Sequence, residues 1–223
     1  MSGPGGPPPV ALVAPSGAGK TTIAHRLVDQ EDGRFVFSVS ATTRAPRPGE
    51  VDGVDYCFVS RDRFQEMVRE GELAEYATVH GELYGTPLSF LREARAAGRT
   101  VLLDIDVQGA LQIRERVPDA VLIFILPPSG SVLLERLSRR GTEDPEQLSR
   151  RMRTALAELK SAPDFPHVVI NDDLDRAVRE VRDIALGRSE GELPSARLRS
   201  LVDDMRSEIE AAAEGGSMDP ELF

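Results

Sequence analysis

The residues most able to do chemistry in this chain are the nine at positions 14–22 (APSGAGKTT), which directly follow an apolar run at 10–13. They match a phosphate-binding loop, G-x-x-x-x-G-K-[ST], in which successive backbone N–H groups and then a helix N-terminus point at one anion. In such a loop the lysine, here Lys20, reaches the β- and γ-phosphates, and the next hydroxyl, on Thr21, binds Mg²⁺. The pattern therefore predicts a site for a nucleotide phosphate and a divalent cation.

The loop departs from the pattern at one position, because Ala14 stands where the first glycine is expected. The extra methyl group must fit where the pattern has no side chain, so we expect some cost in affinity. The alternative interpretation is a glycine-rich turn with no ligand. Against it, the chain holds only two lysines, Lys20 and Lys160, and one of them occupies the position that the loop requires.

Composition sets the broad class of the protein. The chain has 223 residues, of which 40% are hydrophobic and 29% charged, as in ordinary globular proteins. It can form one large domain, alone or with appendages, and bury roughly 70% of its unfolded surface. The net charge of −10 argues against broad, sequence-independent nucleic-acid binding, although a local arginine cluster can still bind a phosphate.

The single cysteine, Cys57, rules out an intramolecular disulfide and favours a reducing cytosol. Its neighbours Tyr56, Phe58 and Val59 indicate a strand, so we expect a packed thiol and not a nucleophile. No stretch approaches 18 apolar residues, and the start of the chain lacks the basic and apolar regions of a signal peptide. We therefore expect a cytoplasmic protein with no membrane partner.

Short β-branched runs alternate with segments of helical periodicity. The runs predict strands at 10–13, 35–39, 101–105, 121–126 and 168–170. The periodic segments predict helices at 20–29, 61–70, 88–97, 107–116, 131–139, 145–161 and 174–186. This order predicts an α/β fold with a parallel sheet and helices on both faces. Ligands of such sheets bind at the carboxyl ends of the strands, where the loop lies.

Three other stretches break this alternation. Residues 1–9 (MSGPGGPPP) read as a disordered leader, and 40–85 as a polar excursion with two or three short strands and one helix. Residues 188–223 read as a linker, a last helix and a flexible tail. That helix carries one apolar stripe, which docks on its own domain more often than on a partner: Leu198, Leu201, Val202, Met205 and Ile209.

Further motifs follow the loop in a fixed order. They are SATTRAPRPGEVDGVDYCFV at 40–59, Glu75, YGT at 84–86, LDIDVQG at 103–109, RGT at 140–142, Arg151 and NDD at 171–173. With the loop they resemble guanylate kinase, which phosphorylates GMP to GDP with ATP. The resemblance covers about residues 10–187. It implies a core at 10–39 and 86–187, a small mixed α+β GMP-binding insertion at 40–85 and a helical lid at 136–153.

The resemblance places the two substrates, ATP and GMP, on separate sets of residues. The ATP set is Ala14, Pro15, Ser16, Gly17, Ala18, Gly19, Lys20, Thr21, Thr22, Asn171 and Asp172. The GMP set is Ser40, Arg44, Arg47, Tyr56, Glu75, Tyr84, Gly85, Thr86, Asp104 and Asp106. For Asn171 and Asp172, near the adenine, a helix-capping role is nearly as plausible.

The residue types suit this chemistry without the family. Arginine offers a bidentate fork to a phosphate, which lysine cannot, so Arg44 and Arg47 can hold a nucleotide phosphate with Tyr56 and Tyr84 as phenolic donors. Taken alone, an Arg-Ala-Pro-Arg segment is more often a solvated loop. A carboxylate that accepts from guanine N1–H and N2–H₂ selects guanine over adenine, and the resemblance implies Glu75 for this role, with hydroxyls on Ser40 and Thr86.

Asp104 and Asp106 end a buried-strand pattern and are two residues apart, so on a strand they would point to one face. One could orient the water shell of Mg²⁺, and the resemblance implies Asp104 beside Thr21. The other, Asp106, would face the nucleoside. The alternative roles are a helix N-cap or a buried ion pair.

Arginines flank a break between two predicted helices. The resemblance assigns Arg136, Arg140 and Arg151 to the transferred phosphoryl group, and with Lys20 and Arg44 they form the catalytic set. Cations are what phosphoryl transfer requires at the equatorial oxygens, so we expect a mobile lid. We expect Arg139, Arg150 and Arg153 to face solvent or to pair with Glu143 and Glu146.

Two rival functions remain. A non-catalytic guanylate-kinase-like module that binds a phosphorylated ligand would be expected to lack the lysine, the lid arginines or the paired aspartates, and only Ala14 favours it. A P-loop kinase acting on a phosphorylated ribose would not need Ser40, Glu75 and Thr86. The sequence leaves open whether the protein is a monomer or a homo-oligomer.

Overall fold

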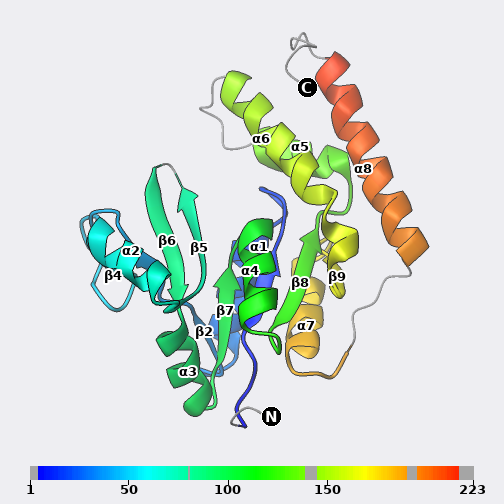
Figure 1. Cartoon of the computed structure of the whole chain (residues 1–223). Helices are drawn as coiled ribbons and strands as arrows, with labels where there is room; N and C mark the ends of the chain where they lie inside the picture. Colours follow the sequence, from blue (N-terminus) through cyan, green and yellow to red (C-terminus); the bar gives the residue numbers. More distant parts are fainter. Residues whose placement is uncertain (1–4, 80, 139–144, 190–194, 216–223) are drawn as a thin grey trace. The chain divides into compact units, whose positions relative to one another are not determined.

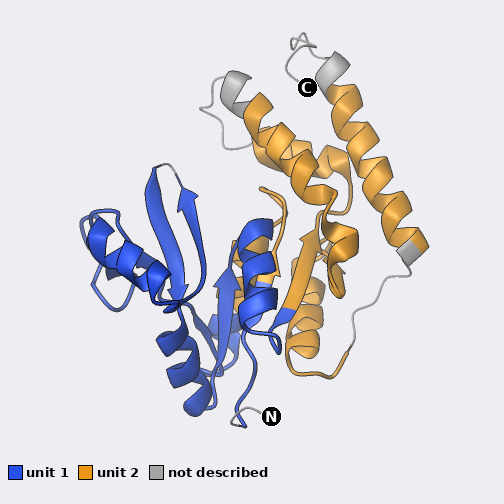
Figure 2. Cartoon of the chain, in the orientation of Figure 1, with its two compact units in different colours: residues 1–11, 27–121 blue, residues 12–26, 122–223 orange. Residues whose placement is uncertain are grey.

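The computed structural model describes residues 5–79, 81–138, 145–189 and 195–215. The chain divides into two compact units (Figure 2). Unit 1 comprises residues 1–11 and 27–121, and unit 2 comprises residues 12–26 and 122–223. The ATP set predicted from the sequence falls entirely in unit 2 and the GMP set entirely in unit 1.

The five predicted strands form one sheet with the order β2-β7-β1-β8-β9 (Figure 1). Their bounds are β1 Val10–Val13, β2 Phe35–Phe37, β7 Thr100–Asp104, β8 Val121–Leu126 and β9 His167–Ile170. β2 pairs with β7 and β8 with β9 in parallel. All four residues of β1 are buried, as are most of β7 and β8, as expected for strands covered on both faces. The predicted α/β class is confirmed.

The helices end within two residues of the predicted positions. They are α1 Lys20–Gln30, α2 Arg61–Arg69, α3 Leu88–Ala96, α4 Val107–Arg116, α5 Gly130–Ser138, α6 Pro145–Leu159, α7 Leu174–Ala185 and α8 Ser195–Gly215. The largest difference is at the end of α6, which the sequence extends to 161. The helix ends at Leu159 because a 3₁₀ turn, Ala162–Asp164, with a proline in it, follows directly.

The polar excursion forms a second sheet with the order β4-β3-β6-β5. Its strands are β3 Ala41–Thr42, β4 Cys57–Phe58, β5 Leu73–Val79 and β6 Glu82–Pro87, which is one strand more than predicted. β3 and β4 are two residues long, too short to leave a period in the sequence. Buried Phe64 and Met67 of α2 pack on Ala41 and Leu73. Cys57 is half-buried in β4, and burial raises the pKa of its thiol, as expected of a packed cysteine.

Two predictions about the ends of the chain can be compared with the structure. The leader prediction is wrong for its last residues, because buried Pro9 accepts a hydrogen bond from Val121 N–H and Gly6 accepts one from Arg95. Residues 1–4 lie outside the described part. In unit 2, α8 packs beside α5 and α6 (Figure 1). Its apolar stripe is buried except for half-buried Leu201, and Glu208 accepts from Ser131 N–H, so the docked helix is confirmed.

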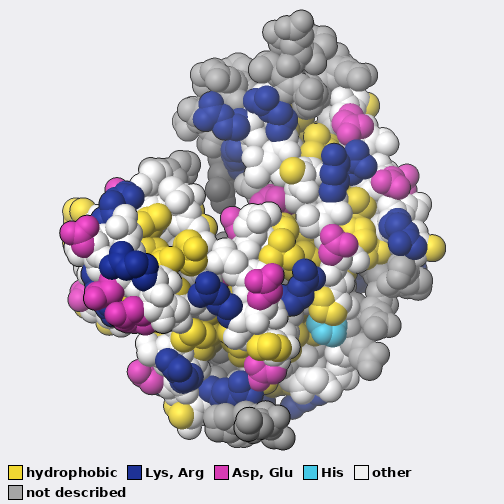
Figure 3. Space-filling view, in the orientation of Figure 1, with side chains coloured by type: hydrophobic (Ala, Val, Ile, Leu, Met, Phe, Trp, Pro, Cys, Tyr) yellow, Lys and Arg dark blue, Asp and Glu magenta, His cyan; other side chains and the backbone are white. Residues whose placement is uncertain are grey.

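The surface of the described residues is charged and mixed in sign. Figure 3 shows acidic and basic side chains scattered over the viewed face, with apolar groups between them. No helix in the described part is long and apolar enough to cross a bilayer.

Candidate nucleotide-binding sites

The loop at 14–19 connects the end of β1 to the first residue of α1, Lys20. Two of its residues, Gly17 and Gly19, have φ values of 92° and 95°, a region that side chains rarely adopt. The Ala18 N–H donates to Pro15 O at 3.0 Å, so the loop folds back on itself. Ala14 is 5% exposed and lies at the start of the loop. The loop leads into the N-terminus of α1, and helix N-termini of this kind favour anions.

A cavity of about 720 Å³ surrounds this loop, within the size range of nucleotide-sized ligand sites. Its walls include Arg136, Glu158 and Leu174 in addition to the loop. Ten of the eleven residues predicted to bind ATP line it: Ala14, Pro15, Ser16, Gly17, Gly19, Lys20, Thr21, Thr22, Asn171 and Asp172. The exception, Ala18, is fully buried, and its carbonyl oxygen accepts hydrogen bonds behind the cavity wall.

Asn171 supports the loop from the end of β9. Its side chain is buried, and Nδ2 donates to Ala18 O at 2.8 Å. The same nitrogen leaves no room at Gly19, where an added Cβ would overlap it. Asn171 therefore fixes the loop shape as well as bordering the cavity.

Replacing Gly19 by alanine should damage the loop in two ways, since the methyl would collide with Asn171 and φ would be strained. We expect Gly19→Ala to raise the Kd for Mg·ATP by about 10- to 100-fold, by isothermal titration calorimetry. Gly33→Ala is the matched control, because Gly33 has φ 79° but nothing within 4 Å. Gly33→Ala should lower the stability of the protein and leave the Kd for Mg·ATP unchanged. Equal Kd values for the two variants would contradict the packing argument.

Two of the three predicted lid arginines contact the loop or its support. Arg136 of α5 donates to Ala18 O at 3.4 Å and to Asn171 O at 3.5 Å. Arg151 of α6 donates to Ser16 Oγ at 3.4 Å. Arg140 lies outside the described residues, as do Arg139 and Glu143. Of the other arginines, Arg150 and Arg153 are exposed on α6, as expected.

Asp172 borders the cavity without capping α7. The N-cap is its neighbour Asp173, whose side chain accepts from Arg176 N–H. Asp172 accepts from Asp173 N–H and pairs with Arg176. Its carboxylate is therefore engaged at the first turn of α7.

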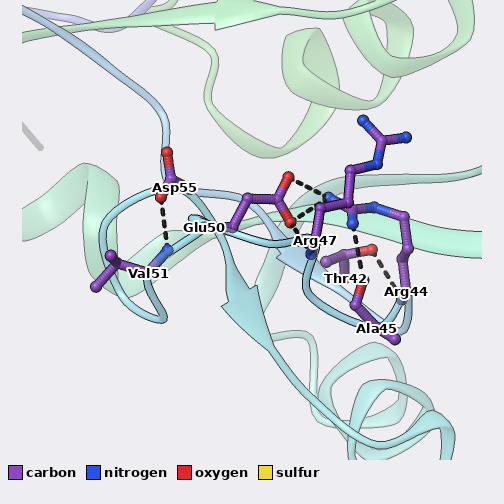
Figure 4. A network of polar contacts seen from close by, with 7 residues as sticks. All are labelled: Thr42, Arg44, Ala45, Arg47, Glu50, Val51 and Asp55. Atoms are coloured by element: carbon purple, nitrogen blue, oxygen red, sulfur yellow. Dashed lines mark hydrogen bonds and ion pairs between the residues drawn. The ribbon is translucent and has the colours of Figure 1, made fainter.

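In unit 1, the predicted phosphate ligand Arg44 is held by a carboxylate (Figure 4). Its guanidinium donates to both oxygens of Glu50 at 2.8 and 3.0 Å, which lowers the pKa of Glu50 and raises that of Arg44. The Arg47 N–H also donates to Glu50, at 2.6 Å, while its side chain extends away from the carboxylate. Glu50 thus organises both arginines of the loop.

Aromatic rings complete this arginine site. The Arg44 guanidinium lies 5.3 Å from the ring centre of Tyr56 and 5.8 Å from that of Phe58. The Tyr56 and Tyr84 rings are 6.0 Å apart. The structure thereby brings together one predicted arginine and both predicted tyrosines.

The predicted base-reading carboxylate, Glu75, is 6% exposed on β5. It faces Thr86 of β6 in the strand register, and Thr86 Oγ1 donates to Glu75 Oε1 at 2.7 Å. Burial raises the pKa of Glu75, the Thr86 hydrogen bond opposes the rise, and the nearby charge of Asp106 adds to it. Gly85, which precedes Thr86 on β6, is also buried and pairs with Tyr76 of β5. Ser40 precedes β3, and its carbonyl accepts from Cys57 N–H.

The expectation that Asp104 and Asp106 share one face of a strand is wrong. β7 ends at Asp104, and Asp106 is the N-cap of α4, accepting from Gly109 N–H at 2.8 Å. The alternative role of N-cap is therefore the one observed. The first turn of α4 has unpaired N–H groups that need an acceptor, which Asp106 supplies, and the strand ends one residue before its predicted end at 105.

Two residues that contact predicted ligand-binding residues were not predicted from the sequence. Glu50 was noted for its spacing but given no role, although its place six residues after Arg44 in a short loop allows a contact. Glu158 was not noted at all. It accepts from Ser16 N–H at 3.3 Å and lines the cavity, yet it occupies an ordinary position on an amphipathic helix.

A glycine-bearing loop between a buried strand and a helix, with a lysine opening that helix and a cavity around it, defines a P-loop nucleotide-binding α/β protein. Comparison with known sequences and structures narrows the class. The sequence model described as guanylate kinase matches residues 7–186, so the chain belongs to the guanylate kinase family.

Relatives agree over most of their length. The chain is 47% identical to guanylate kinase of Rhodococcus jostii over 183 residues, 81% of this chain and 88% of that protein. It is 48% identical to guanylate kinase of Corynebacterium glutamicum over 180 residues, 80% and 94% of the two chains. The crystal structure of guanylate kinase from Anaplasma phagocytophilum shares 31% identity with a TM-score of 0.61, covering 89% of this chain and 95% of that one.

Proposed function

We propose that this chain is an ATP:GMP phosphotransferase that catalyses ATP + GMP = ADP + GDP. Family membership supports the reaction, and one structural observation carries the choice of acceptor. Within unit 1 a buried carboxylate, Glu75, is held by the hydroxyl of Thr86, in a sheet that also carries the Arg44 site. A buried carboxylate is the group that a guanine base, with its N1–H and N2–H₂ donors, can satisfy.

The donor nucleotide binds in unit 2. The loop N–H groups and the N-terminus of α1 hold the phosphates, and Lys20 spans the β- and γ-groups. Arg136 and Arg151, which contact the loop in the structure, supply cations for the γ-phosphoryl oxygens. Asn171 keeps the loop in shape beneath the nucleotide.

The transfer is a single in-line displacement. An oxygen of the GMP phosphate forms a bond to the γ-phosphorus while the bond from that phosphorus to the β,γ-bridging oxygen breaks, and that oxygen leaves as part of ADP. Arg44, oriented by Glu50, holds the attacking phosphate in place. No nucleophile of the protein takes part, so no covalent enzyme intermediate forms.

Mg²⁺ fits this site as an ion that takes most of its ligands from the substrate phosphates and few from the protein. In the described part of the chain, no group of three or more His, Cys, Asp or Glu residues could cage a metal. Mg²⁺ commonly binds one or two protein groups, with phosphates and waters completing its shell. Thr21, which lines the cavity, would hold it. The ion would neutralise charge on the β- and γ-oxygens.

The acid–base state of Glu75 predicts how GMP binding depends on pH. The carboxyl must be ionised to accept from the base, and burial raises its pKa above the ordinary 4.5. We therefore expect GMP binding to release protons, and the Kd for GMP to rise on acidification from pH 7 to pH 5. The GMP phosphate also titrates near pH 6. The test therefore compares how the Kd for GMP changes with pH in wild type and in Glu75→Gln. The same pH dependence in both proteins across this range would contradict the assignment.

We also propose that the protein works in the cytoplasm, in purine nucleotide metabolism; its single cysteine and its family membership support this. The reaction is tested with ATP labelled at the γ-phosphorus. With GMP present, the label should move to the β-phosphate of GDP. No label should stay on the protein, and ATP–ADP exchange should not occur without GMP. GMP binding without transfer would favour the non-catalytic module instead.

A further inference from the structure

We infer that Glu158 sets the preference of the phosphate-binding loop between nucleoside triphosphate and nucleoside diphosphate, because its carboxylate competes with the terminal phosphate for one end of the loop. The inference rests on the proposed ATP site. Glu158 lies on α6, 142 residues along the chain from Ser16, and its Oε2 accepts from the Ser16 N–H at 3.3 Å. It lines the same cavity as Lys20.

Ser16 marks the end of the loop where the transferred group would lie. In such sites the loop N–H groups hold the α- and β-phosphates, and the lysine, here Lys20, reaches the β- and γ-phosphates. Arg151, which we assign to the transferred phosphoryl group, donates to Ser16 Oγ at 3.4 Å. The N–H that Glu158 occupies therefore belongs to the loop residue that also contacts the arginine assigned to the terminal phosphate.

One face of α6 carries both charged side chains that contact Ser16. Arg151 and Glu158 are seven residues apart on α6, about two helical turns, so their side chains lie on one side of the helix. The guanidinium contacts the Ser16 side chain and the carboxylate contacts the Ser16 backbone. A terminal phosphate is attracted by the first group and repelled by the second.

A triphosphate and a diphosphate meet this pair differently. The γ-phosphate is an anion that must displace the Glu158 carboxylate or lie against it, and like charges at short range in a partly buried site repel strongly. A diphosphate ends one group earlier and leaves the Ser16–Glu158 contact in place. The carboxylate therefore weakens ATP binding relative to ADP binding, and the contact can re-form once the phosphoryl group has moved to the acceptor.

The test compares Kd values for Mg·ATP and Mg·ADP by calorimetry, without any acceptor. Glu158→Gln keeps an oxygen that can accept from Ser16 N–H but removes the charge. We expect the Kd for Mg·ATP to fall about tenfold and the Kd for Mg·ADP to stay within about twofold. The matched control is Glu210→Gln. Glu210 is an exposed carboxylate of α8 that pairs with Arg206 and does not line the cavity, so neither Kd should change.

An unchanged ratio of the two Kd values in Glu158→Gln would overturn the inference, and so would weaker ATP binding. A parallel loss of both affinities and of the melting temperature would mean that Glu158 only braces α6 on the loop. Because no acceptor is present, these results do not depend on GMP being the substrate. A wild-type chain that bound neither nucleotide would contradict the proposed function itself.

Discussion

Lys20→Ala should lower kcat for GMP phosphorylation by about a thousandfold or more while leaving the fold intact. Lys20 opens α1 and lines the cavity, where we place its ammonium group between the β- and γ-phosphates. Removing one preorganised donor from a developing charge typically costs about 10²- to 10³-fold, and here the donor is also a full charge. The measurement is ADP release with saturating GMP, with the circular dichroism spectrum as the check on folding.

The chain supplies its own control for this experiment. Lys160 is the second of the two lysines and is exposed after the end of α6. Lys160→Ala makes the same chemical change, so it should retain wild-type kcat. Substantial activity in Lys20→Ala, or an equal loss in both variants, would contradict the assignment of the loop.

Glu75→Gln should lower kcat/KM for GMP by about a hundredfold or more and leave the Kd for Mg·ATP unchanged. The amide keeps the size of the side chain, but its NH₂ group is a donor that opposes the guanine donors, and it can orient only one oxygen. Sites built to hydrogen-bond a substrate lose 10⁴–10⁵ when the pairing is removed completely, and this variant removes part of it. The Thr86 hydroxyl can still donate to the remaining oxygen, so the sheet should stay intact.

Glu115→Gln is the matched control for this variant. Glu115 is an exposed carboxylate of α4, in the same unit. Its replacement by glutamine makes the same change in net charge. It should have wild-type kinetics with GMP. GMP kinetics of Glu75→Gln equal to those of the control would show that another residue reads the base.

Much of the fold follows from periodicity in the sequence. Apolar runs such as 121–126 are too continuous for a surface element, and the helix predicted at 107–116 begins and ends as α4 does. The phosphate-binding loop was recognisable because its function requires residue types at fixed spacing. The same applies to Glu75 and Thr86, which the family resemblance identified and which the register of β5 and β6 then brought opposite each other.

The remaining features depend on contacts that spacing does not encode. Asp106 lies between the predicted strand at 101–105 and the predicted helix at 107–116, and the sequence left both a position in line with the strand and an N-cap open. Strands β3 and β4 are two residues long, and they form because β3 pairs with β4 on one side and with β6 on the other. The contact of Glu158 with Ser16 joins residues 142 positions apart. The apolar pattern of α6 predicts which side of the helix is buried, but it does not predict which residue Glu158 contacts.

The most direct test of the account is a coupled ADP-release assay with Mg·ATP and GMP, AMP, CMP or UMP in turn. We expect rapid turnover with GMP and rates near background with the other three, which would also show that the loop tolerates Ala14. Turnover with AMP comparable to that with GMP would contradict base selection by Glu75. No turnover with any acceptor, from folded protein that binds GMP, would contradict the catalytic assignment.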